Sequence, residues 1–336
     1  MVTTSYWSGY PHVISADQFG KSWLLDALFP AAERMVELVK LPVGERPQPL
    51  AGMGLYNLFY RESTRTRARF SRAMQLLGGT VEGTEDAEAF SSAKKGETLE
   101  DTIRTICSLL YDVIVIRHHE EGSAAKAAQA SFGAPIINAG DGSGEHPTQA
   151  LLDLYTIFRE FGRIDGLSIA LVGDLNRGRT VRSLARLLAK FDGVTVYMVS
   201  PSPLAMREDV KEYLRAHDTK YFELLDLREV APLVHSVYLT RSQEERPVAG
   251  ATTRVEIAAR FDQRQPGQPD PLYGLNEEIL ELLQDHAIIM HPLPRNDVFG
   301  ELPSRFTEEP RVRIFHQVTN GLYISMALLV LALAPQ

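Results

Sequence analysis

Seven short apolar runs, most of them separated by segments with a helical period, constrain the fold of this chain most strongly. Because the runs are continuous rather than alternating, they predict strands buried on both faces of a sheet. The helical period between them is seen in Phe70, Ala73 and Leu77. Strands that alternate with helices predict an α/β fold with doubly wound, mostly parallel central sheets flanked by helices. The expected strands are 55–60, 112–116, 135–138, 167–172, 194–199, 236–239 and 287–290.

Chain length and two expected helices suggest how the fold is divided. With 336 residues the chain is long enough for two domains of ordinary size. A helix that begins at Pro147 and ends at Phe161, just before Gly162, is expected to join them. The apolar tail predicts a buried helix that packs back on the first domain. The predicted domains are 1–150 together with the C-terminal helix 319–334, and 151–318.

Composition limits the partners that the chain is expected to have. A formal charge of −8 argues against nucleic acid, because duplex binding depends on positive faces. No stretch approaches the ~20 apolar residues that span a bilayer, and the first ten residues do not resemble a secretory signal. No membrane role and a cytoplasmic location are therefore expected. The single cysteine, Cys107, lies at helical spacing from Ile103 and Leu110, which predicts a core residue and excludes an intrachain disulfide.

The residues that follow the first predicted strand suggest an anion site. Ligands of open α/β sheets bind beyond the carboxyl ends of the strands. Ser63, Thr64, Arg65 and Thr66 occupy that position and begin a helix for which Ser63 is a suitable N-cap. Free backbone N–H groups, hydroxyls and a guanidinium at a helix start predict a phosphate site. Arg69 and Arg72, farther along the same helix, are expected to be solvated.

Later strands also end in polar side chains, so one pocket lined by guanidinium groups and amides is expected. Arg117 ends the second strand, and a glycine-rich segment at 140–144 leads to His146 and Gln149 at the start of the linking helix. These glycines are expected to let the backbone approach a ligand. A polar loop with Lys94 and Lys95 precedes a capping box at Thr98 and Asp101. In the second half the corresponding residues are Arg179, Thr240, Arg241, Gln243 and the run His291–Arg295.

The segment 173–180 imitates a P-loop, which makes nucleotide binding an alternative to consider. A strand, two glycines five positions apart, a basic residue, a threonine and a helix follow one another there. However, Arg179 stands at the lysine position, and a guanidinium suits bidentate capture of a carboxylate better. No Ser-His-Asp or Cys-His pairing and no cluster at metal-ligand spacing is evident. The sequence therefore predicts neither covalent catalysis nor a metal or cofactor.

Taken in order, these motifs resemble those of the aspartate/ornithine carbamoyltransferase family over nearly the whole chain. The resemblance implies an enzyme that transfers the carbamoyl group of carbamoyl phosphate to the amine of L-aspartate. The products would be N-carbamoyl-L-aspartate and phosphate, in pyrimidine biosynthesis. The motifs that carry the resemblance are STRTR at 63–67, KKGETLEDT at 94–102, NAGDG and HPTQALLDL within 138–154, GDL and GRTV within 173–181, TRSQEER at 240–246 and HPLPR at 291–295.

The resemblance also implies roles for individual residues toward carbamoyl phosphate. Arg117 would bridge its phosphate and carbonyl oxygen, and His146 and Thr66 would polarise the carbonyl. The catalytic residues implied are Arg65, Thr66, Arg117 and His146. The groups that would hold carbamoyl phosphate are Ser63, Thr64, Arg65, Thr66, Arg117, His146, Gln149 and the backbone carbonyls of Pro292 and Leu293.

A second set is implied for the acceptor and for assembly. Arg179, Arg241, Gln243 and Lys95 would bind the two carboxylates of aspartate. Ser91 and Lys95 match a loop that reaches into a neighbouring subunit's site, which implies a homotrimer with shared sites. Regulatory or dihydroorotase chains in a larger complex remain open.

Three alternatives remain. Ornithine enzymes of the same family usually carry a cysteine in the counterpart of 291–294 and a Ser-Met-Gly motif, and neither is present. A paralogue with another acidic amine is open because Arg61, the pair Asn176-Arg177 and the long segment 247–274 depart from the family pattern. A catalytically silent ligand-binding protein is the alternative from another class, although Arg65 and His146 are both retained.

Overall fold

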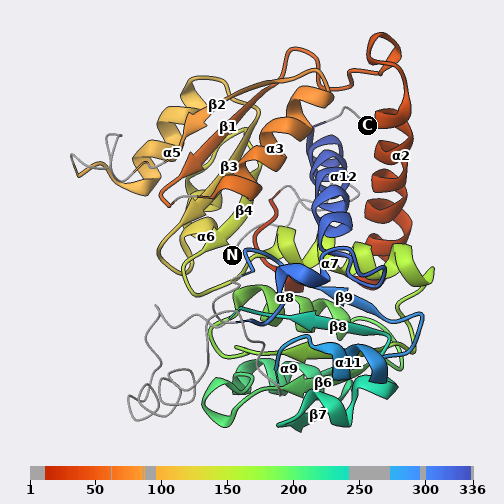
Figure 1. Ribbon diagram of the computed structural model, residues 1–336. Coiled ribbons are helices and arrows are strands. Elements are labelled where there is room, and N and C mark those ends of the chain that lie inside the picture. The colour runs from red at the N-terminus through yellow and green to blue at the C-terminus, as the bar shows by residue number, and fades with distance from the viewer. Residues whose placement is uncertain are drawn as a thin grey trace. The chain divides into compact units, whose positions relative to one another are not determined.

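The computed structural model describes residues 12–61, 63–85, 87, 96–241, 273–295 and 300–333. The chain forms two compact units, one of Met1–Tyr155 with Thr319–Gln336 and the other of Thr156–Val318. Both changes from one unit to the other occur inside helices, α7 (Pro147–Phe161) and α12 (Ile314–Leu333). Each unit has a parallel sheet with helices on it (Figure 1), so the expected fold class is confirmed.

The first unit is built on a four-stranded sheet with the order β2-β1-β3-β4. All three strand pairings are parallel, for example Leu55 beside Val113. The strands are β1 (Gly54–Phe59), β2 (Thr80–Thr84), β3 (Val113–His118) and β4 (Ile136–Asp141). The helices and helical turns are η1 (Ala16–Gln18), α1 (Lys21–Trp23), η2 (Leu24–Leu28), α2 (Phe29–Lys40), η3 (Val43–Glu45), α3 (Thr64–Leu76), α5 (Leu99–Ser108) and α6 (Ser123–Ala130).

Alternation along these strands sends neighbouring side chains to opposite faces of the first sheet. Leu58, Ile114 and Ile116 pack with α5 and α6 on one face. The other alternate residues face α3, as the hydrogen bond from Asn57 Nδ2 to Ser71 Oγ indicates. Figure 1 shows α3 on one side of this sheet and α5 on the other. Arg117 and His118, at the end of β3, are therefore directed to different faces.

The second unit has a five-stranded parallel sheet with the order β7-β6-β5-β8-β9. Its core on one face gathers alternate residues of β5 and β8, such as Val172 and Leu239, with α11. The strands are β5 (Ser168–Val172), β6 (Thr195–Val199), β7 (Lys220–Leu224), β8 (Ser236–Leu239) and β9 (Ile288–Met290). The helices and helical turns are α8 (Arg179–Leu188), η5 (Ser202–Leu204), α9 (Glu208–Ala216), η6 (Leu227–Glu229), η7 (Ala231–Leu233), α11 (Glu277–Leu282) and η8 (Ser304–Phe306).

All seven strands expected from apolar runs are present, with ends that differ by a few residues at most. Two further strands, β2 and β7, do not come from apolar runs. Each lies at an edge of its sheet, and their residues are exposed or half-buried. Because an edge strand faces solvent more than a central one does, it needs no continuous apolar run to form.

The two helices expected at the unit boundaries also form. The linking helix has the predicted limits, and Gly162 follows it with a left-handed φ of 67°. By length and composition, α12 is the one helix of the described residues that could cross a membrane, yet 56% of that stretch is buried inside the protein. A core helix passes the same test, and burial is what the prediction requires. Cys107 is buried as expected, with its Sγ 3.4 Å from Ser131 Oγ.

Candidate active site

The order of the strands in the first sheet reverses between β1 and β3. From β1 the chain continues to β2 on one side, while β3 and β4 lie on the other. The carboxyl ends of the two strands are joined there, because the Tyr60 N–H donates to the Arg117 carbonyl at 2.9 Å. The Arg117 Nη1 in turn donates to the Ala139 carbonyl of β4 at 3.4 Å. Such a reversal is where open α/β sheets bind ligands.

The first turn of α3 begins just beyond β1 at this reversal. Ser63 is the N-cap residue, as expected, but its hydroxyl makes no capping hydrogen bond. The first helical bond runs from the Arg67 N–H to the Ser63 carbonyl at 3.2 Å. The N–H groups before Arg67 therefore lie at the positive end of the helix without helical acceptors. Thr64 and Arg65 are exposed and Thr66 is buried, an arrangement suited to an anion.

The start of α7 adds two buried polar side chains in the same unit, His146 and Gln149. His146 Nδ1 lies 3.3 Å from Thr148 Oγ1. The Gln149 Nε2 donates to Asp153 Oδ1 at 2.9 Å, which fixes the orientation of the amide. His146 and Gln149 follow the end of β4, so three strand ends of one sheet supply the polar groups.

The glycine-rich segment before His146 packs against protein rather than against open space. A Cβ on Gly142, whose φ is 46°, would lie 2.6 Å from the His119 carbonyl oxygen. The Gly142 N–H donates to the His118 carbonyl, and Asp141 accepts from the Gly122 and Glu145 N–H groups. The expectation that Gly142 admits a ligand is thus wrong, because the end of β3 already occupies the space that a side chain would need.

Arg69 differs from its expected role. It was expected to be solvated, but its Nη2 donates to Thr148 Oγ1 at 3.3 Å, and it is only partly exposed. Burial lowers the pKa of Arg69 to about 10, while the nearby Asp153 carboxylate opposes the shift. Arg72, one turn farther along α3, is exposed as expected.

The second sheet also reverses its strand order, between β5 and β8. Arg179 begins α8 beyond β5, and only 8% of its surface is exposed. Thr240 and Arg241 follow β8, and Thr240 Oγ1 donates to the Val172 carbonyl at 2.8 Å, which ties the two strand ends together. The carboxylate-binding candidates of the second unit thus lie at the position where its own sheet would bind a ligand.

Packing accounts for the P-loop-like pattern between β5 and α8. A Cβ on Gly173 would lie 2.6 Å from the Thr240 carbonyl oxygen, and one on Gly178 would lie 2.6 Å from that of Asp174. The Arg177 N–H donates to Asp174 Oδ1 at 2.9 Å, and its guanidinium lies 3.4 Å from Oδ2. Both glycines are therefore required by neighbouring backbone, which explains the spacing without a nucleotide.

The segment after β9 is held in an unusual backbone conformation. Leu293 has a φ of 56°, and the Leu293–Pro294 peptide is cis. The buried His291 ring accepts from the Leu293 N–H at Nδ1, 2.9 Å away, while its Nε2 lies 3.4 Å from Glu301 Oε1. Gln317 Oε1 accepts the His291 N–H at 2.8 Å. His291 thereby fixes the backbone of Pro292 and Leu293.

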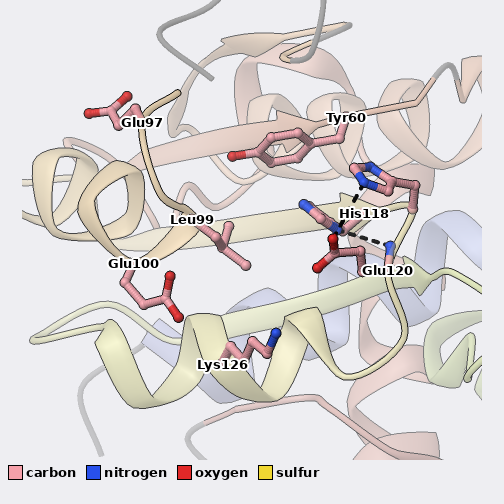
Figure 2. Close-up of a pocket in the computed structure, with 8 residues that line it drawn as sticks. Tyr60, Glu97, Leu99, Glu100, His118, Glu120 and Lys126 are labelled. Carbon is pink, nitrogen blue, oxygen red and sulfur yellow. Dashed lines mark hydrogen bonds and ion pairs between the residues drawn. The ribbon is translucent and has the colours of Figure 1, made fainter. Parts of the chain in front are cut away.

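A separate cavity of about 300 Å³ lies on the α5 and α6 face of the first sheet (Figure 2). Figure 2 shows Glu97 and Glu100 at the start of α5, Lys126 of α6, and the Tyr60 and His118 side chains around it. Burial, and next the neighbouring His119, lower the pKa of His118 to about 4. Its Nδ1 accepts from the Glu120 N–H at 3.0 Å. With three glutamates in its lining, this cavity does not suit a phosphate.

Not every predicted site residue can be placed. Ser91, Lys95 and Gln243 lie outside the described residues, as does most of the segment 247–274. The structure places the remaining candidates at the sheet reversals of the two units, and a single pocket for both sets stays a prediction. Sequence reasoning missed Arg69 and Asp153. The signal for them was Asp153 itself, an acid inside the apolar run of the linking helix, because a buried carboxylate needs donors or a cation.

Comparison with known proteins gives consistent matches along the chain. The carbamoyl-phosphate-binding domain of the aspartate/ornithine carbamoyltransferase family matches residues 11–159, and its Asp/Orn-binding domain matches residues 165–332. Aspartate carbamoyltransferase 1, chloroplastic, from Pisum sativum is 48% identical over 94% of this chain and 77% of its own length. The catalytic subunit of the Vibrio cholerae enzyme is 40% identical over 88% of this chain and 89% of its own.

Solved structures agree with these relatives. The catalytic subunit of aspartate transcarbamoylase from M. jannaschii has a TM-score of 0.81 at 41% identity, covering 95% of this chain and 96% of its own. The Trypanosoma cruzi enzyme in complex with carbamoyl phosphate and aspartate has a TM-score of 0.83 at 36% identity, covering 96% of this chain and 97% of its own. The chain therefore belongs to the aspartate/ornithine carbamoyltransferase family and is a carbamoyltransferase.

Proposed function

We propose that this chain transfers the carbamoyl group of carbamoyl phosphate to the amine of L-aspartate, a step of pyrimidine biosynthesis. The observation that carries the proposal is the arrangement at the reversal of the first sheet. The start of α3, which has no side-chain cap, adjoins the end of β3 with Arg117, and the buried His146 and Gln149 follow β4. Phosphate-binding groups and carbonyl-polarising groups thus share one edge of one sheet.

The first unit would bind carbamoyl phosphate. Ser63, Thr64, Arg65 and the N–H groups of the first turn of α3 would hold the phosphate, where the helix dipole favours negative charge. Arg117 would contact both the phosphate and the carbonyl oxygen. Gln149 would accept from the carbamoyl NH₂, because its own NH₂ is already donated to Asp153.

The reaction needs positioning and positive charge rather than a covalent intermediate. When the neutral amine attacks, the carbonyl oxygen gains negative charge, and donors placed in advance stabilise it. Thr66 and His146 would supply those donors. The bond to phosphate then breaks, and phosphate leaves as an anion beside Arg65 and Arg117. We infer that the departing phosphate accepts the proton that the amine loses.

The second unit would supply the acceptor site. Arg179 and Arg241 would bind the aspartate carboxylates, a task for which planar guanidinium groups are suited. The Pro292 and Leu293 carbonyls, fixed by His291, would hold the carbamoyl NH₂. Gln243 and Lys95 would complete the carboxylate contacts. The complex of the T. cruzi relative with carbamoyl phosphate and aspartate supports this pair of substrates.

The deciding experiment measures phosphate release from carbamoyl phosphate with a panel of amines that includes aspartate, glutamate and ornithine. We expect release with aspartate and formation of N-carbamoyl-L-aspartate. Release with another acidic amine alone would make the protein a specialised paralogue. Release with ornithine but not aspartate would overturn the acceptor assignment, and no release with any amine would favour a silent binding protein.

We also propose that three copies of the chain share their active sites. The proposal depends on Ser91 and Lys95, which would reach the site of a neighbouring subunit. Lys95→Ala and Arg65→Ala chains, each inactive alone, should regain part of the activity when mixed, because one site in the mixed trimer can be intact. Verified mixed trimers without activity would contradict shared sites.

The location and the wider assembly belong to the same proposal. We infer a cytoplasmic location, although the plant relatives are named as chloroplastic. Fractionation of the source cells, with the activity assayed in each fraction, tests the location. Size measurement of the native complex tests whether regulatory or dihydroorotase chains accompany the trimer.

A further inference from the structure

Arg69 connects the start of α3 to the start of α7 inside the first unit. Its Nη2 donates to Thr148 Oγ1 at 3.3 Å. Thr148 is fully buried, and the same Oγ1 lies 3.3 Å from His146 Nδ1. A continuous polar path therefore runs from α3 through Arg69 and Thr148 to His146.

The direction of these hydrogen bonds follows from what each group can donate. A guanidinium has donors only, so Thr148 Oγ1 must accept from Arg69. The single hydroxyl hydrogen of Thr148 is then directed to His146 Nδ1. A neutral imidazole that accepts at Nδ1 carries its proton on Nε2. This chain of bonds thus makes His146 Nε2 a donor, the state that polarisation of a carbonyl requires.

Asp153 links Arg69 to the other polar side chain of this region. Asp153 is fully buried, and its negative charge favours the charged state of Arg69. Its Oδ1 accepts from Gln149 Nε2 at 2.9 Å, so the carbonyl end of the Gln149 amide is left as an acceptor. A buried carboxylate is costly unless a cation or donors accompany it, and Arg69 and Gln149 are both present.

Helix α12 leaves room for Arg69 by means of a glycine. A Cβ added to Gly321 would lie 2.9 Å from Leu152 Cδ2, 3.0 Å from Arg69 Cδ and 3.1 Å from Arg69 Nη1. Arg69 is therefore enclosed by α12 as well as bonded to α7. A side chain held on several sides loses rotamer freedom, so its hydrogen bonds keep one direction.

We propose that Arg69 is a positioning residue for carbamoyl transfer, which acts through Thr148 on the proton of His146 and through Asp153 on the amide of Gln149. This inference rests on the proposed function, because His146 and Gln149 have their roles only if carbamoyl phosphate binds beside them. Arg69 itself contacts neither substrate in this scheme. Its removal should change turnover more than the binding of phosphate.

The test compares Arg69→Met with Arg72→Met, which removes the same charge from an exposed position of the same helix. For Arg69→Met we expect kcat to fall at least tenfold. The KM for aspartate and the inhibition constant of inorganic phosphate should change less than twofold. Arg72→Met should leave all three constants within twofold of the parent. A uniform loss, with phosphate binding weakened as much as kcat, would indicate a folding defect of the site and overturn the inference.

Variants of Thr148 test the path independently of Arg69. Thr148→Ser keeps the hydroxyl and should retain at least half of kcat, whereas Thr148→Val should show the same loss as Arg69→Met. Because both residues act along one path, the double variant should be no slower than the slower single variant. An unchanged kcat in Thr148→Val, or additive losses in the double variant, would overturn the proposed path.

Nitrogen NMR of ¹⁵N-histidine protein, with His146→Gln used to assign the signal, reports which ring nitrogen carries the proton. We expect Nε2 in the parent and a mixture of tautomers in Arg69→Met. The same tautomer in both proteins would contradict the inference. This measurement does not need turnover. If the parent transferred no carbamoyl group to any amine, the proposed function would fail while the effect of Arg69 on His146 could still be observed.

Discussion

The helices α3 and α8 begin at equivalent places in the two units, yet they present their arginines differently. Each follows a strand at the reversal of its sheet, and neither has a side-chain capping bond. Arg65 of α3 is exposed, whereas Arg179 of α8 is buried next to the Asp174–Arg177 pair. The same location in one fold thus gives an open anion site in one unit and an enclosed guanidinium in the other. The difference suits a mobile phosphate and a dicarboxylate that must be selected.

The largest effect is expected at the exposed arginine. Arg65→Ala should lose roughly 2 to 4 kcal/mol of transition-state stabilisation, since it removes a donor directed at developing charge. Measurement of kcat/KM for carbamoyl phosphate checks this. A decrease of less than tenfold would mean that the start of α3 is not the phosphate site, and the comparison of the two helices would lose its basis.

The buried arginine should respond to a change of shape without a change of charge. Arg179→Lys replaces a planar fork by a point charge, so the KM for aspartate should rise by about 1.5 to 3 kcal/mol in free-energy terms. The KM for carbamoyl phosphate should change less than twofold. Arg186→Lys, on the same helix and paired with Asp209 at the surface, serves as the control. Equal increases in both KM values would show that Arg179 does not discriminate between the substrates.

The third prediction uses the opposite face of β3, where no substrate is expected. The pKa of His118 is about 4 in the folded chain and about 6.5 when unfolded, so the unfolded state binds the extra proton first. Its contribution to stability is complete above pH 6.5 and is lost as the pH falls from there toward 4. Because the ring borders a solvent-accessible cavity, the loss should be about 1 to 2 kcal/mol.

His118→Asn keeps an acceptor for the Glu120 N–H but does not titrate. Urea unfolding at pH 7 and pH 4.5 should therefore show a smaller pH dependence in this variant than in the parent. Its kcat/KM should stay within threefold of the parent value. A larger decrease in activity would place the α5 and α6 face of the sheet in the reaction and blur the distinction between the two sides of β3.

The smallest effect separates two helix starts within the first unit. Thr98 caps α5 with a bond to the Asp101 N–H at 3.1 Å, so Thr98→Ala should lower the free energy of unfolding by about 1 kcal/mol. Ser63 makes no such bond, and Ser63→Ala should lower it by less than about 0.5 kcal/mol while weakening phosphate inhibition. Equal losses of stability would mean that Ser63 acts as an ordinary cap.

The central strands and the main sites could be predicted because they depend on patterns local in the sequence. Continuous apolar runs located seven strands, and polar residues after them located the reversals of both sheets. The edge strands β2 and β7 could not be found in this way, since their half-exposed residues lack an apolar run. Gly142 was misread because its close neighbour, the end of β3, is remote in the chain.

Arg69 illustrates a further limit of sequence reasoning. Its spacing from Arg65 and Arg72 is that of a solvated helix face, and nothing local distinguishes it from them. Its burial depends on Thr148 and Gly321, which come from helices 79 and 252 positions away by residue number. Only the acid within the apolar run of the linking helix, Asp153, could have signalled that a cation was needed there.

The first unit contains residues from both ends of the described chain, with α12 packed against Leu152 and Arg69. During synthesis the ribosome completes every residue of the second unit before it makes the segment that finishes the first. The unit translated first is therefore completed last, and the enclosure of Arg69 must wait for release of the final helix. Premature termination anywhere before residue 319 should leave the earlier-made half of the protein, rather than the later one, unable to mature.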